Sequence, residues 1–305
     1  MIELVWLLNP DKMFEKDWIE YLFKDIPHSH YTDENEEVQY RSPIFIFNAS
    51  VPYESYLLEY SEERTPFGVI HLSDETLGNT CNYLDLEMCN FAIRNYHHPI
   101  YSQHPKMITI GLGYKAGFNV SESDANNNPP ISLRSRDPWF HWCFVGAVHH
   151  QARHDAIVTF LSVKPYILSV YANGFNTPNL TIQQYKNTMI LSKFALCPIG
   201  QGNLDTFRFY EALESGCVPI VLSRTEEQPY YPSYWHHLFS QSEKLPFVMG
   251  DTWEECYKIM EELLKDPIKY YGLQSKMTQF WENQKQSWIQ RIQSAVVNLT
   301  NACSP

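Results

Sequence analysis

The residues best suited to chemistry lie between two short apolar runs, Phe194 to Cys197 and Cys217 to Leu222. Both runs are predicted to be buried strands. Pro198, Gly200 and Gly202 break the chain after the first run and predict a loop that leads into a helix. Such a loop directs free N–H groups and the positive end of the helix dipole at one point. This arrangement suits a phosphate group.

Two charged side chains of the predicted helix extend this interpretation. Arg208 lies in the first helical turn, where a cation opposes the dipole by about 0.3–1 kcal/mol. A diphosphate ligand is the simplest reason for a cation there. Glu211 lies one turn further on the same face, where its carboxylate could accept hydrogen bonds from ribose hydroxyls. The alternative is an ordinary surface ion pair over a tight turn, and glycine loops alone are weak signals.

The segment from Ser192 to Leu222 resembles the donor-binding segment of the exostosin-like glycosyltransferases, glycosyltransferase family 47. Fucosyltransferases share its Glu-Ala and Gly-Cys-x-Pro parts. The residues that carry the resemblance are Ser192, Phe194, Leu196, Pro198, Gly200, Arg208, Glu211, Ala212 and Gly216 to Ile220.

This resemblance implies an α/β protein of the GT-B type, with two Rossmann-like domains that face each other across a cleft. It implies that Arg208 meets the donor diphosphate and that Glu211 holds the ribose. Asp205 is also expected to cap the helix, by accepting a hydrogen bond from a free backbone N–H. The loop residues expected at the donor are Gly200, Gly202, Asp205 and Thr206.

The segment Phe144 to Arg153 resembles the first strand and loop of the donor domain in these enzymes. There, Gly146 would let the backbone approach the donor. Arg153 would offer a second cation to the diphosphate. The alternative for Arg153 is a solvated arginine on a helix.

Candidate catalytic carboxylates follow the predicted strand Phe67 to Leu72. In open α/β sheets, ligands bind beyond the carboxyl ends of the strands. An inverting transferase needs a base that deprotonates the acceptor hydroxyl. Asp74 and Glu75 are the candidates, with Glu75 preferred. The alternative is that both acids begin the next helix, where the dipole favours them.

Further along, Tyr114 and Lys115 follow the predicted strand Met107 to Gly111 and are expected on the acceptor side of the site or at the donor sugar. A plain loop is the alternative. No metal site is predicted. His150 and His154 have i, i+4 spacing but lack the glutamate of a His-Glu-x-x-His motif and a third ligand.

Asp85-Leu-Glu87 falls on a predicted helix, Leu84 to Asn90, and is not interpreted as a metal motif either. The resemblance implies no metal cofactor, because in GT-B enzymes cations and helix dipoles usually stabilise the leaving diphosphate.

Composition restricts the class of protein further. The 305 residues allow one large or two medium domains. A formal net charge of −12 argues against a nucleic-acid binder or an anionic-membrane binder. Seven cysteines without a Cys-x-x-Cys pair indicate reduced thiols, so a cytoplasmic location is expected. No apolar run approaches the roughly 18 residues of a membrane span.

Predicted strands and helices alternate on both sides of a polar segment, Ser121 to Pro138, which is interpreted as a linker. Residues 27–42 are predicted to be a loop. Trp281, Trp288 and Ile292 are predicted to form the buried face of a C-terminal helix. The expected domains are an acceptor-side domain with the linker at 1–138, a donor domain at 139–275, and a C-terminal helix at 276–305 that returns to the first domain.

The sequence therefore predicts a nucleotide-sugar-dependent glycosyltransferase of inverting type. The expected partners are a UDP-sugar donor and a glycan hydroxyl, with xylose, galactose, glucuronate and N-acetylglucosamine all open as the transferred sugar. A GDP-fucose-dependent fucosyltransferase is the alternative within this class. A non-catalytic, two-lobed protein that binds a nucleotide or a sugar is the alternative from another class.

Overall fold

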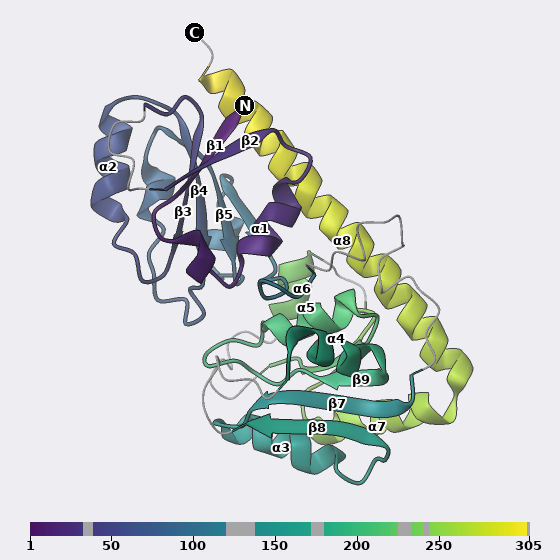
Figure 1. Cartoon of the computed structure of the whole chain (residues 1–305). Helices are drawn as coiled ribbons and strands as arrows, with labels where there is room; N and C mark the ends of the chain where they lie inside the picture. The colour runs from purple at the N-terminus through teal and green to yellow at the C-terminus, as the bar shows by residue number, and fades with distance from the viewer. Residues whose placement is uncertain (33–38, 120–137, 172–179, 225–233, 241–243, 304–305) are drawn as a thin grey trace. The chain divides into compact units, whose positions relative to one another are not determined.

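The computed structural model describes residues 1–32, 39–119, 138–171, 180–224, 234–240 and 244–303. The chain forms two compact units. The first comprises Met1–Leu112 with Lys285–Pro305, and the second comprises Gly113–Gln284. Each unit contains one parallel β-sheet with helices on its faces, so the predicted α/β class is confirmed (Figure 1). The predicted linker lies almost entirely outside the described residues.

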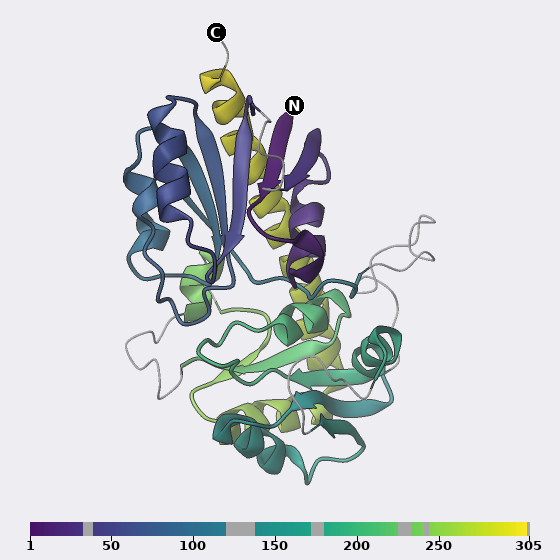
Figure 2. The same cartoon turned by 60° about the vertical axis from the view of Figure 1, so that its left-hand side comes forward.

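The first unit is built on a six-stranded sheet with the order β2-β1-β3-β4-β5-β6. Its strands are β1 (Ile2–Trp6), β2 (His28–Thr32), β3 (Pro43–Asn48), β4 (Phe67–Leu72), β5 (Cys89–Asn95) and β6 (Met107–Ile110). Helices α1 (Lys16–Phe23) and α2 (Glu54–Glu62) lie on opposite faces of this sheet (Figures 1 and 2). The 3₁₀ turns are η1 (Pro10–Lys12), η2 (Asn82–Asp85) and η3 (Tyr101–Gln103).

The central strands of this sheet are continuous apolar runs because helices cover both of their faces. In β3, Ile44, Phe45, Ile46 and Phe47 are all fully buried. Phe47 stacks on Tyr53, which lies just before α2, with 4.1 Å between ring centroids. The chain winds outward in opposite directions from β1 and β3, so the topological switch point of the sheet lies between these two strands.

The second unit has a five-stranded sheet with the order β11-β10-β9-β7-β8. Its strands are β7 (Phe140–Ala147), β8 (Tyr166–Tyr171), β9 (Ser192–Leu196), β10 (Val218–Leu222) and β11 (Val248–Gly250). Its helices are α3 (Gln151–Phe160), α4 (Ile182–Ile190), α5 (Phe207–Glu214), α6 (Tyr234–Phe239) and α7 (Trp253–Lys265), together with the start of α8 (Pro267–Ala302). The switch point of this sheet lies between β7 and β9.

The predicted strand, loop, helix and strand of the segment Ser192 to Leu222 are confirmed as β9, a loop, α5 and β10. Gly216 ends α5 with a left-handed φ of 64°. Its N–H donates to the Leu213 carbonyl, and the Cys217 N–H donates to the Ala212 carbonyl. These two bonds form a Schellman motif, which releases the chain directly into β10.

The last helix of the structure, α8, is a single continuous element. The predicted buried residues Trp281, Trp288 and Ile292 are all fully buried. Trp281 donates through Nε1 to Glu214 within the second unit, at 2.8 Å. Trp288 packs edge-on against Trp18 within the first unit, at 6.1 Å between ring centroids. No helix in the described part of the chain has both the length and the apolar character that a membrane span requires.

Two predictions of secondary structure are wrong. Residues 27–42 include β2, an edge strand whose side chains are only partly buried and which therefore has no apolar run. The predicted helix Leu84 to Asn90 is the end of η2 followed by the start of β5. A helix of that length is unstable without an apolar face to bury, and here the pairing of Cys89 with Phe67 extends the sheet instead.

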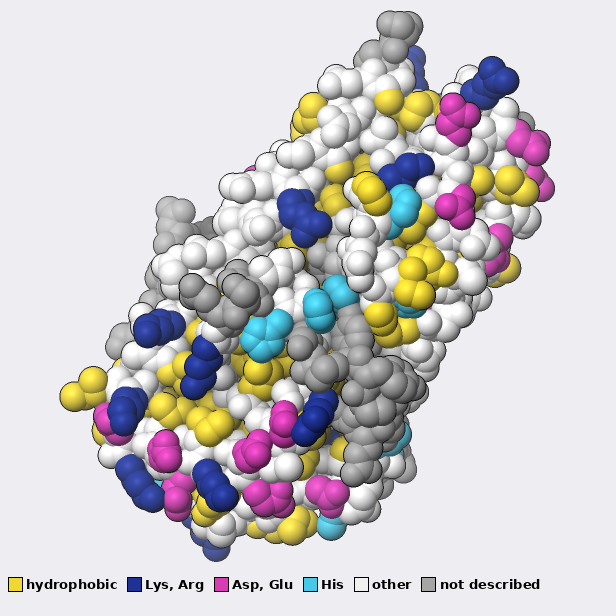
Figure 3. Space-filling model, turned by 180° about the vertical axis from the view of Figure 1, so that it is seen from behind, with side chains coloured by type: hydrophobic (Ala, Val, Ile, Leu, Met, Phe, Trp, Pro, Cys, Tyr) yellow, Lys and Arg dark blue, Asp and Glu magenta, His cyan; other side chains and the backbone are white. Residues whose placement is uncertain are grey.

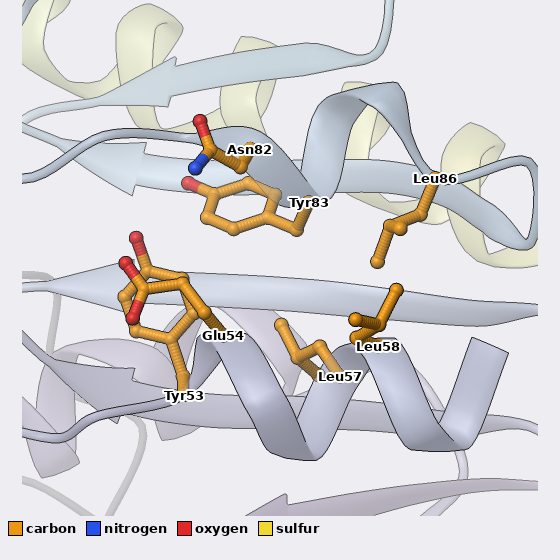
Figure 4. Close-up of a pocket in the computed structure, with 7 residues that line it drawn as sticks. All are labelled: Tyr53, Glu54, Leu57, Leu58, Asn82, Tyr83 and Leu86. Atoms are coloured by element: carbon orange, nitrogen blue, oxygen red, sulfur yellow. The ribbon is translucent and has the colours of Figure 1, made fainter.

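The seven cysteines are all free in this structure, and six of them are buried. On the face drawn in Figure 3, acidic and basic side chains are interspersed. A pocket lies between α2 and η2, and none of the predicted site residues lines it (Figure 4). Its lining residues are Tyr53, Glu54, Leu57, Leu58, Asn82, Tyr83 and Leu86.

Candidate functional site

The predicted donor residues of the second unit gather at the switch point between β7 and β9. Because neighbouring parallel strands end at the same edge of a sheet, the end of β7 lies beside the loop that follows β9. That loop leads directly into the first turn of α5. In open α/β sheets this crevice, outside the carboxyl ends of the strands at a switch point, is where ligands bind.

Arg208 lies across the end of β7. Its guanidinium donates from Nη2 and Nε to the Val145 carbonyl, at 2.8 and 3.2 Å. Its Cζ lies 4.6 Å from the ring centroid of Phe144, a cation–π contact. Within the described residues no carboxylate forms an ion pair with Arg208. The predicted ion pair with Glu211, the alternative to a ligand site, is therefore not formed in this structure.

Gly146 provides the space that Arg208 occupies. A Cβ atom at this position would lie 2.4 Å from Nη2 of Arg208, closer than real Cβ contacts approach. The sequence-based role for Gly146 was to let a donor approach the backbone. In the structure the space over this glycine is filled by the guanidinium, so Gly146 determines where the positive charge of Arg208 lies.

Arg153 connects the two segments that frame the crevice. This side chain, on α3, is only 8% exposed. It donates from Nη1 to the Ala147 carbonyl at the end of β7, and from Nε to the Ile199 carbonyl in the loop after β9, both at 3.0 Å. Arg153 is therefore not a solvated helix arginine. It fixes the loop against the strand and adds positive charge beneath it.

Glu211 is buried behind the first turn of α5. Its Oε2 accepts a 2.6 Å hydrogen bond from the Tyr185 hydroxyl of α4, and its Oε1 accepts one from the Lys115 N–H at 3.3 Å. Burial raises the pKa of Glu211 above its ordinary value, against the opposing effect of these two donors. A carboxylate offers about four lone-pair positions, so two donors leave positions for further hydrogen bonds.

The loop residues have distinct positions. The Gly200 N–H donates to the Asn203 carbonyl at 2.9 Å, which closes the turn, and Gly202 is partly exposed. The prediction that Asp205 caps α5 is wrong, because the N-cap residue is Thr206. Asp205 instead accepts a 3.0 Å hydrogen bond from the Tyr234 hydroxyl. A neighbouring helix supplies that partner, which local sequence cannot reveal.

Thr206 makes no side-chain capping bond to α5. Its Oγ1 is buried and has no hydrogen-bond partner among the described residues. The start of α5 therefore combines the backbone N–H groups of its first turn, a buried hydroxyl without a partner among the described residues, and the Arg208 guanidinium. These groups are all hydrogen-bond donors, two of them with positive potential, which is the chemistry that binds a phosphate.

Asp74, one of the two candidate bases, belongs to a buried ion pair in the first unit. Its Oδ2 lies 2.6 Å from Nη2 of Arg94. The N–H groups of Gly78 and Asn79 also donate to its carboxylate, at 2.9 and 3.0 Å. Burial alone would raise the pKa of Asp74, but Arg94 and these N–H groups hold it below its ordinary value. A carboxylate stabilised in this way is a poor proton acceptor.

Glu75 is the more accessible of the two candidates. It is partly exposed and directly follows Asp74, after the carboxyl end of β4. The predicted alternative, that both acids begin a helix, is wrong, since an irregular segment follows β4 as far as η2. Ser73 has a left-handed φ of 60°, so the chain turns sharply at the point where Glu75 is presented.

Sequence reasoning missed Glu15, which lies at the same edge of the first sheet. Its Oε1 accepts hydrogen bonds from Ser73 Oγ at 2.5 Å and from Asn95 Nδ2 at 3.2 Å. Its Oε2 is buried without a hydrogen-bond partner in the described residues. Burial raises the pKa of Glu15, so the group keeps its proton to higher pH than an exposed glutamate. The only signal in the sequence is a glutamate beside the start of an amphipathic helix.

The remaining candidates are dispersed. Tyr114 is buried and packs near Phe118, with 6.4 Å between ring centroids. Lys115 contributes its backbone N–H to Glu211, and burial lowers the pKa of its ammonium group. His150 is the N-cap residue of α3, and His154 is exposed on that helix. Asp85 and Glu87 are both exposed at the surface of the first unit.

Two solved structures resemble the whole chain in fold. One is a mutant O-GlcNAc transferase from Thermobaculum terrenum, with a TM-score of 0.53 and 8% identity, covering 99% of this chain and 68% of that chain. The other is an α-glucosyltransferase in complex with UDP-glucose and abasic DNA, with a TM-score of 0.50 and 11% identity, covering 92% and 94%. With the two parallel sheets, these likenesses confirm the predicted GT-B glycosyltransferase fold.

Sequence comparison identifies the family. No curated protein matches the chain. The family model for the RXYLT1 C-terminal domain matches residues 125–298, which include the crevice between β7 and β9 and all of α5. The narrower resemblance to the exostosin family stays a prediction. Because the match covers more than half of the sequence, this protein belongs to the family of the RXYLT1 C-terminal domain.

Proposed function

We propose that this protein is a nucleotide-sugar-dependent glycosyltransferase that transfers a sugar from a UDP-sugar to a glycan hydroxyl with inversion. The observation that carries the proposal is the position of Arg208. Its guanidinium lies at the switch point of the second sheet, beside the start of α5, and is held there by a backbone carbonyl and an aromatic ring. A cation at a helix N-terminus, with no carboxylate partner in the part of the chain that the structure describes, supports the binding of a diphosphate.

The proposed donor site uses the groups of one crevice. The start of α5, the Thr206 hydroxyl and Arg208 bind the diphosphate, while Arg153 keeps the loop in place. The ribose hydroxyls bind Glu211 through lone pairs that Tyr185 and Lys115 leave open. These cations and N–H groups neutralise the diphosphate, so the proposed reaction needs no catalytic metal.

The proposed reaction is an in-line displacement. The acceptor oxygen forms a bond to the anomeric carbon while the bond from that carbon to the phosphate oxygen breaks. The electron pair of the broken bond stays on the diphosphate, where Arg208 and the α5 N–H groups stabilise the new negative charge. Glu75 takes the proton of the acceptor hydroxyl. Asp74 is not proposed for this role, because Arg94 and two backbone N–H groups already bind its carboxylate.

A donor panel with a broad glycan set tests the proposal, with released nucleotide as the readout. UDP-xylose comes first because the matched family is xylosyltransferase-like. UDP-galactose, UDP-glucuronate, UDP-N-acetylglucosamine and GDP-fucose follow. Proton NMR of the anomeric coupling in the product reports whether configuration inverts.

The Arg208→Ala variant is the mutational arm of this experiment. We expect turnover to fall by about 10²–10³-fold, the scale for removing one preorganised charge stabiliser. Arg41→Ala, at an exposed position of the first unit, is the control and should keep turnover. Transfer from GDP-fucose alone would identify a fucosyltransferase. Binding of nucleotides without transfer from any donor would support the non-catalytic alternative and overturn the proposal.

A further inference from the structure

Three side chains that can ligate a metal meet at one edge of the first sheet, where no function was predicted. Glu20 lies on α1, and His28 and His30 lie on the edge strand β2. Residues two apart on a strand point to the same face, so both imidazoles face α1. His28 Nε2 lies 3.5 Å from Glu20 Oε2, and His30 Nε2 lies 3.4 Å from Glu20 Oε1.

These separations, one to each oxygen of the Glu20 carboxylate, are longer than direct charged hydrogen bonds and leave room for an ion between the three side chains. Charged N–H···O bonds to a carboxylate are normally about 2.7–2.9 Å long. Zinc bonds to histidine nitrogen and carboxylate oxygen are about 2.0–2.2 Å long, so neighbouring ligand atoms of a tetrahedral zinc lie about 3.3–3.6 Å apart. The ligand atoms of Glu20, His28 and His30 all lie within 4.8 Å of one another, so small side-chain movements complete the geometry.

The hydrogen bond of His28 to a backbone carbonyl leaves the lone pair of Nε2 available to a metal. Its Nδ1 lies 2.6 Å from the Ile26 carbonyl, which can only accept a hydrogen bond, so the Nδ1 carries the proton. The lone pair of the neutral ring is then on Nε2, which faces Glu20. Metal-bound histidines commonly have this arrangement, in which the second nitrogen donates to a carbonyl that fixes the tautomer and the ring.

For His30 to bind a metal through Nε2, its ring must change tautomer and lose one hydrogen-bond partner. Trp6 Nε1 donates to its Nδ1 at 3.3 Å, which places the proton of the neutral ring on Nε2. When Nε2 binds a metal, this proton moves to Nδ1 and the long bond from Trp6 is lost. The side chain of His30 is 44% exposed, that of Glu20 is 34% exposed and that of His28 is 13% exposed. An ion can therefore reach the three ligands from solvent, and a water molecule can take the fourth position.

We propose that Glu20, His28 and His30 form a zinc site that ties the edge strand β2 to α1. Two imidazoles and one carboxylate form a ligand set that suits zinc. The site stabilises the first unit and is independent of the proposed transfer reaction. A bound ion would also protect an edge strand, whose unpaired backbone groups otherwise invite association with other chains.

The test uses full-length protein without an affinity tag, treated with a chelator and then titrated with zinc alone in a calorimeter. We expect one ion per chain and a rise in the melting temperature. His28→Ala and His30→Ala should each weaken binding by more than about 100-fold, the upper range for losing only an outer-shell partner. His154→Ala is the matched control, since its imidazole also lies near an acid, 3.6 Å from Asp155, but belongs to no group of three possible ligands in the described residues, and this variant should bind zinc like the wild type.

Two further measurements keep the test decisive if an alanine variant folds poorly. Glu20→Gln keeps the size of the side chain but removes its charge, and it should also weaken zinc binding. Cobalt, added in place of zinc, should give the visible absorption bands of a tetrahedral site in the wild type and not in His28→Ala. A chelator should lower the melting temperature and leave the transfer rate unchanged. Absence of stoichiometric zinc binding, or equal binding by His28→Ala and His30→Ala, would overturn the proposal.

Discussion

The two units present different electrostatics at the carboxyl ends of their strands. In the first unit the buried cation Arg94 is neutralised by Asp74 at 2.6 Å. In the second unit Arg208 binds a carbonyl and an aromatic ring, so its charge remains available to a ligand. Under the proposed function, this difference assigns the binding of the anionic diphosphate to the second unit and the proton acceptor to the first unit, where the buried cation already has a counter-charge.

The largest effect is expected from the proposed base. Glu75→Gln should lower turnover by about 10²–10⁴-fold, the range for general acid–base catalysis, while nucleotide binding is retained. Glu87→Gln, another exposed acid of the first unit, is the control and should be active. Steady-state rates with calorimetric UDP affinities check this. Turnover of Glu75→Gln within tenfold of wild type would remove the assignment and direct attention to Glu15.

Asp74→Asn should lose activity because the protein becomes less stable, not because a base is removed. It leaves the buried guanidinium of Arg94 without a counter-charge, and breaking such a pair destabilises a protein by about 3–5 kcal/mol. Denaturant unfolding measures this loss directly. A variant that unfolds like wild type but transfers no sugar would move the catalytic role from Glu75 to Asp74.

Gly146→Ala tests whether the position of the Arg208 charge matters, apart from its presence. The added Cβ would meet Nη2 at 2.4 Å, and the flexible end of the arginine can move away without disturbing the sheet. Turnover should fall by about 10–100-fold, because misplacing a group by about 1 Å can cost about 10²-fold. Gly272→Ala, where a Cβ meets no atom within 4 Å, is the control. Equal activity of the two variants would contradict a positioned charge.

Glu211→Gln examines the ribose contact. Losing hydrogen bonds to a charged acceptor should weaken UDP binding by about 1.5–3 kcal/mol, as measured by calorimetry. Tyr185→Phe removes only the hydroxyl that donates to Glu211 and should keep most of the affinity. If both variants bind UDP like wild type, the ribose is held elsewhere. If both variants lose affinity equally, the hydrogen bond between Tyr185 and Glu211 maintains the shape of the site, and Glu211 does not bind the ribose directly.

The last variant leaves the proposed transfer reaction aside and concerns pH and the buried His71 of the first unit. Burial, with help from Arg94, lowers the pKa of His71 from 6.5 to about 3. The unfolded chain therefore binds more protons between these values, and stability falls as the pH drops from about 6.5 towards 3, by up to about 1.4 kcal/mol per pH unit. His71→Asn should flatten this slope in denaturant unfolding, whereas His154→Asn should not. An unchanged slope in both would show that His71 titrates normally.

The sequence predicted the elements of the second unit's site better than its side-chain contacts, because the elements depend on local signals and the contacts join residues far apart in sequence. The segment Ser192 to Leu222 encodes β9, its loop, α5 and β10 through local signals, namely apolar runs, prolines and glycines. Its contacts with Tyr185 and Val145 are 26 and 63 residues away in sequence, and only the strand order brings them together. Asp74 with Arg94, and Glu15 with Ser73, are likewise distant pairs. The strand β2 was not predicted because its sequence is polar, and an edge strand needs no apolar run.

The most direct test of the central claim is a calorimetric comparison of UDP with UMP, in the wild type and in Arg208→Ala. If the Arg208 guanidinium binds the terminal phosphate, the wild type should prefer UDP over UMP by at least about 10-fold, since hydrogen bonds between charged groups contribute about 1.5–3 kcal/mol. Arg208→Ala should bind UMP as well as the wild type does and lose most of the preference for UDP. An equal preference for UDP in both proteins, or no binding of either nucleotide to the wild type, would contradict the account.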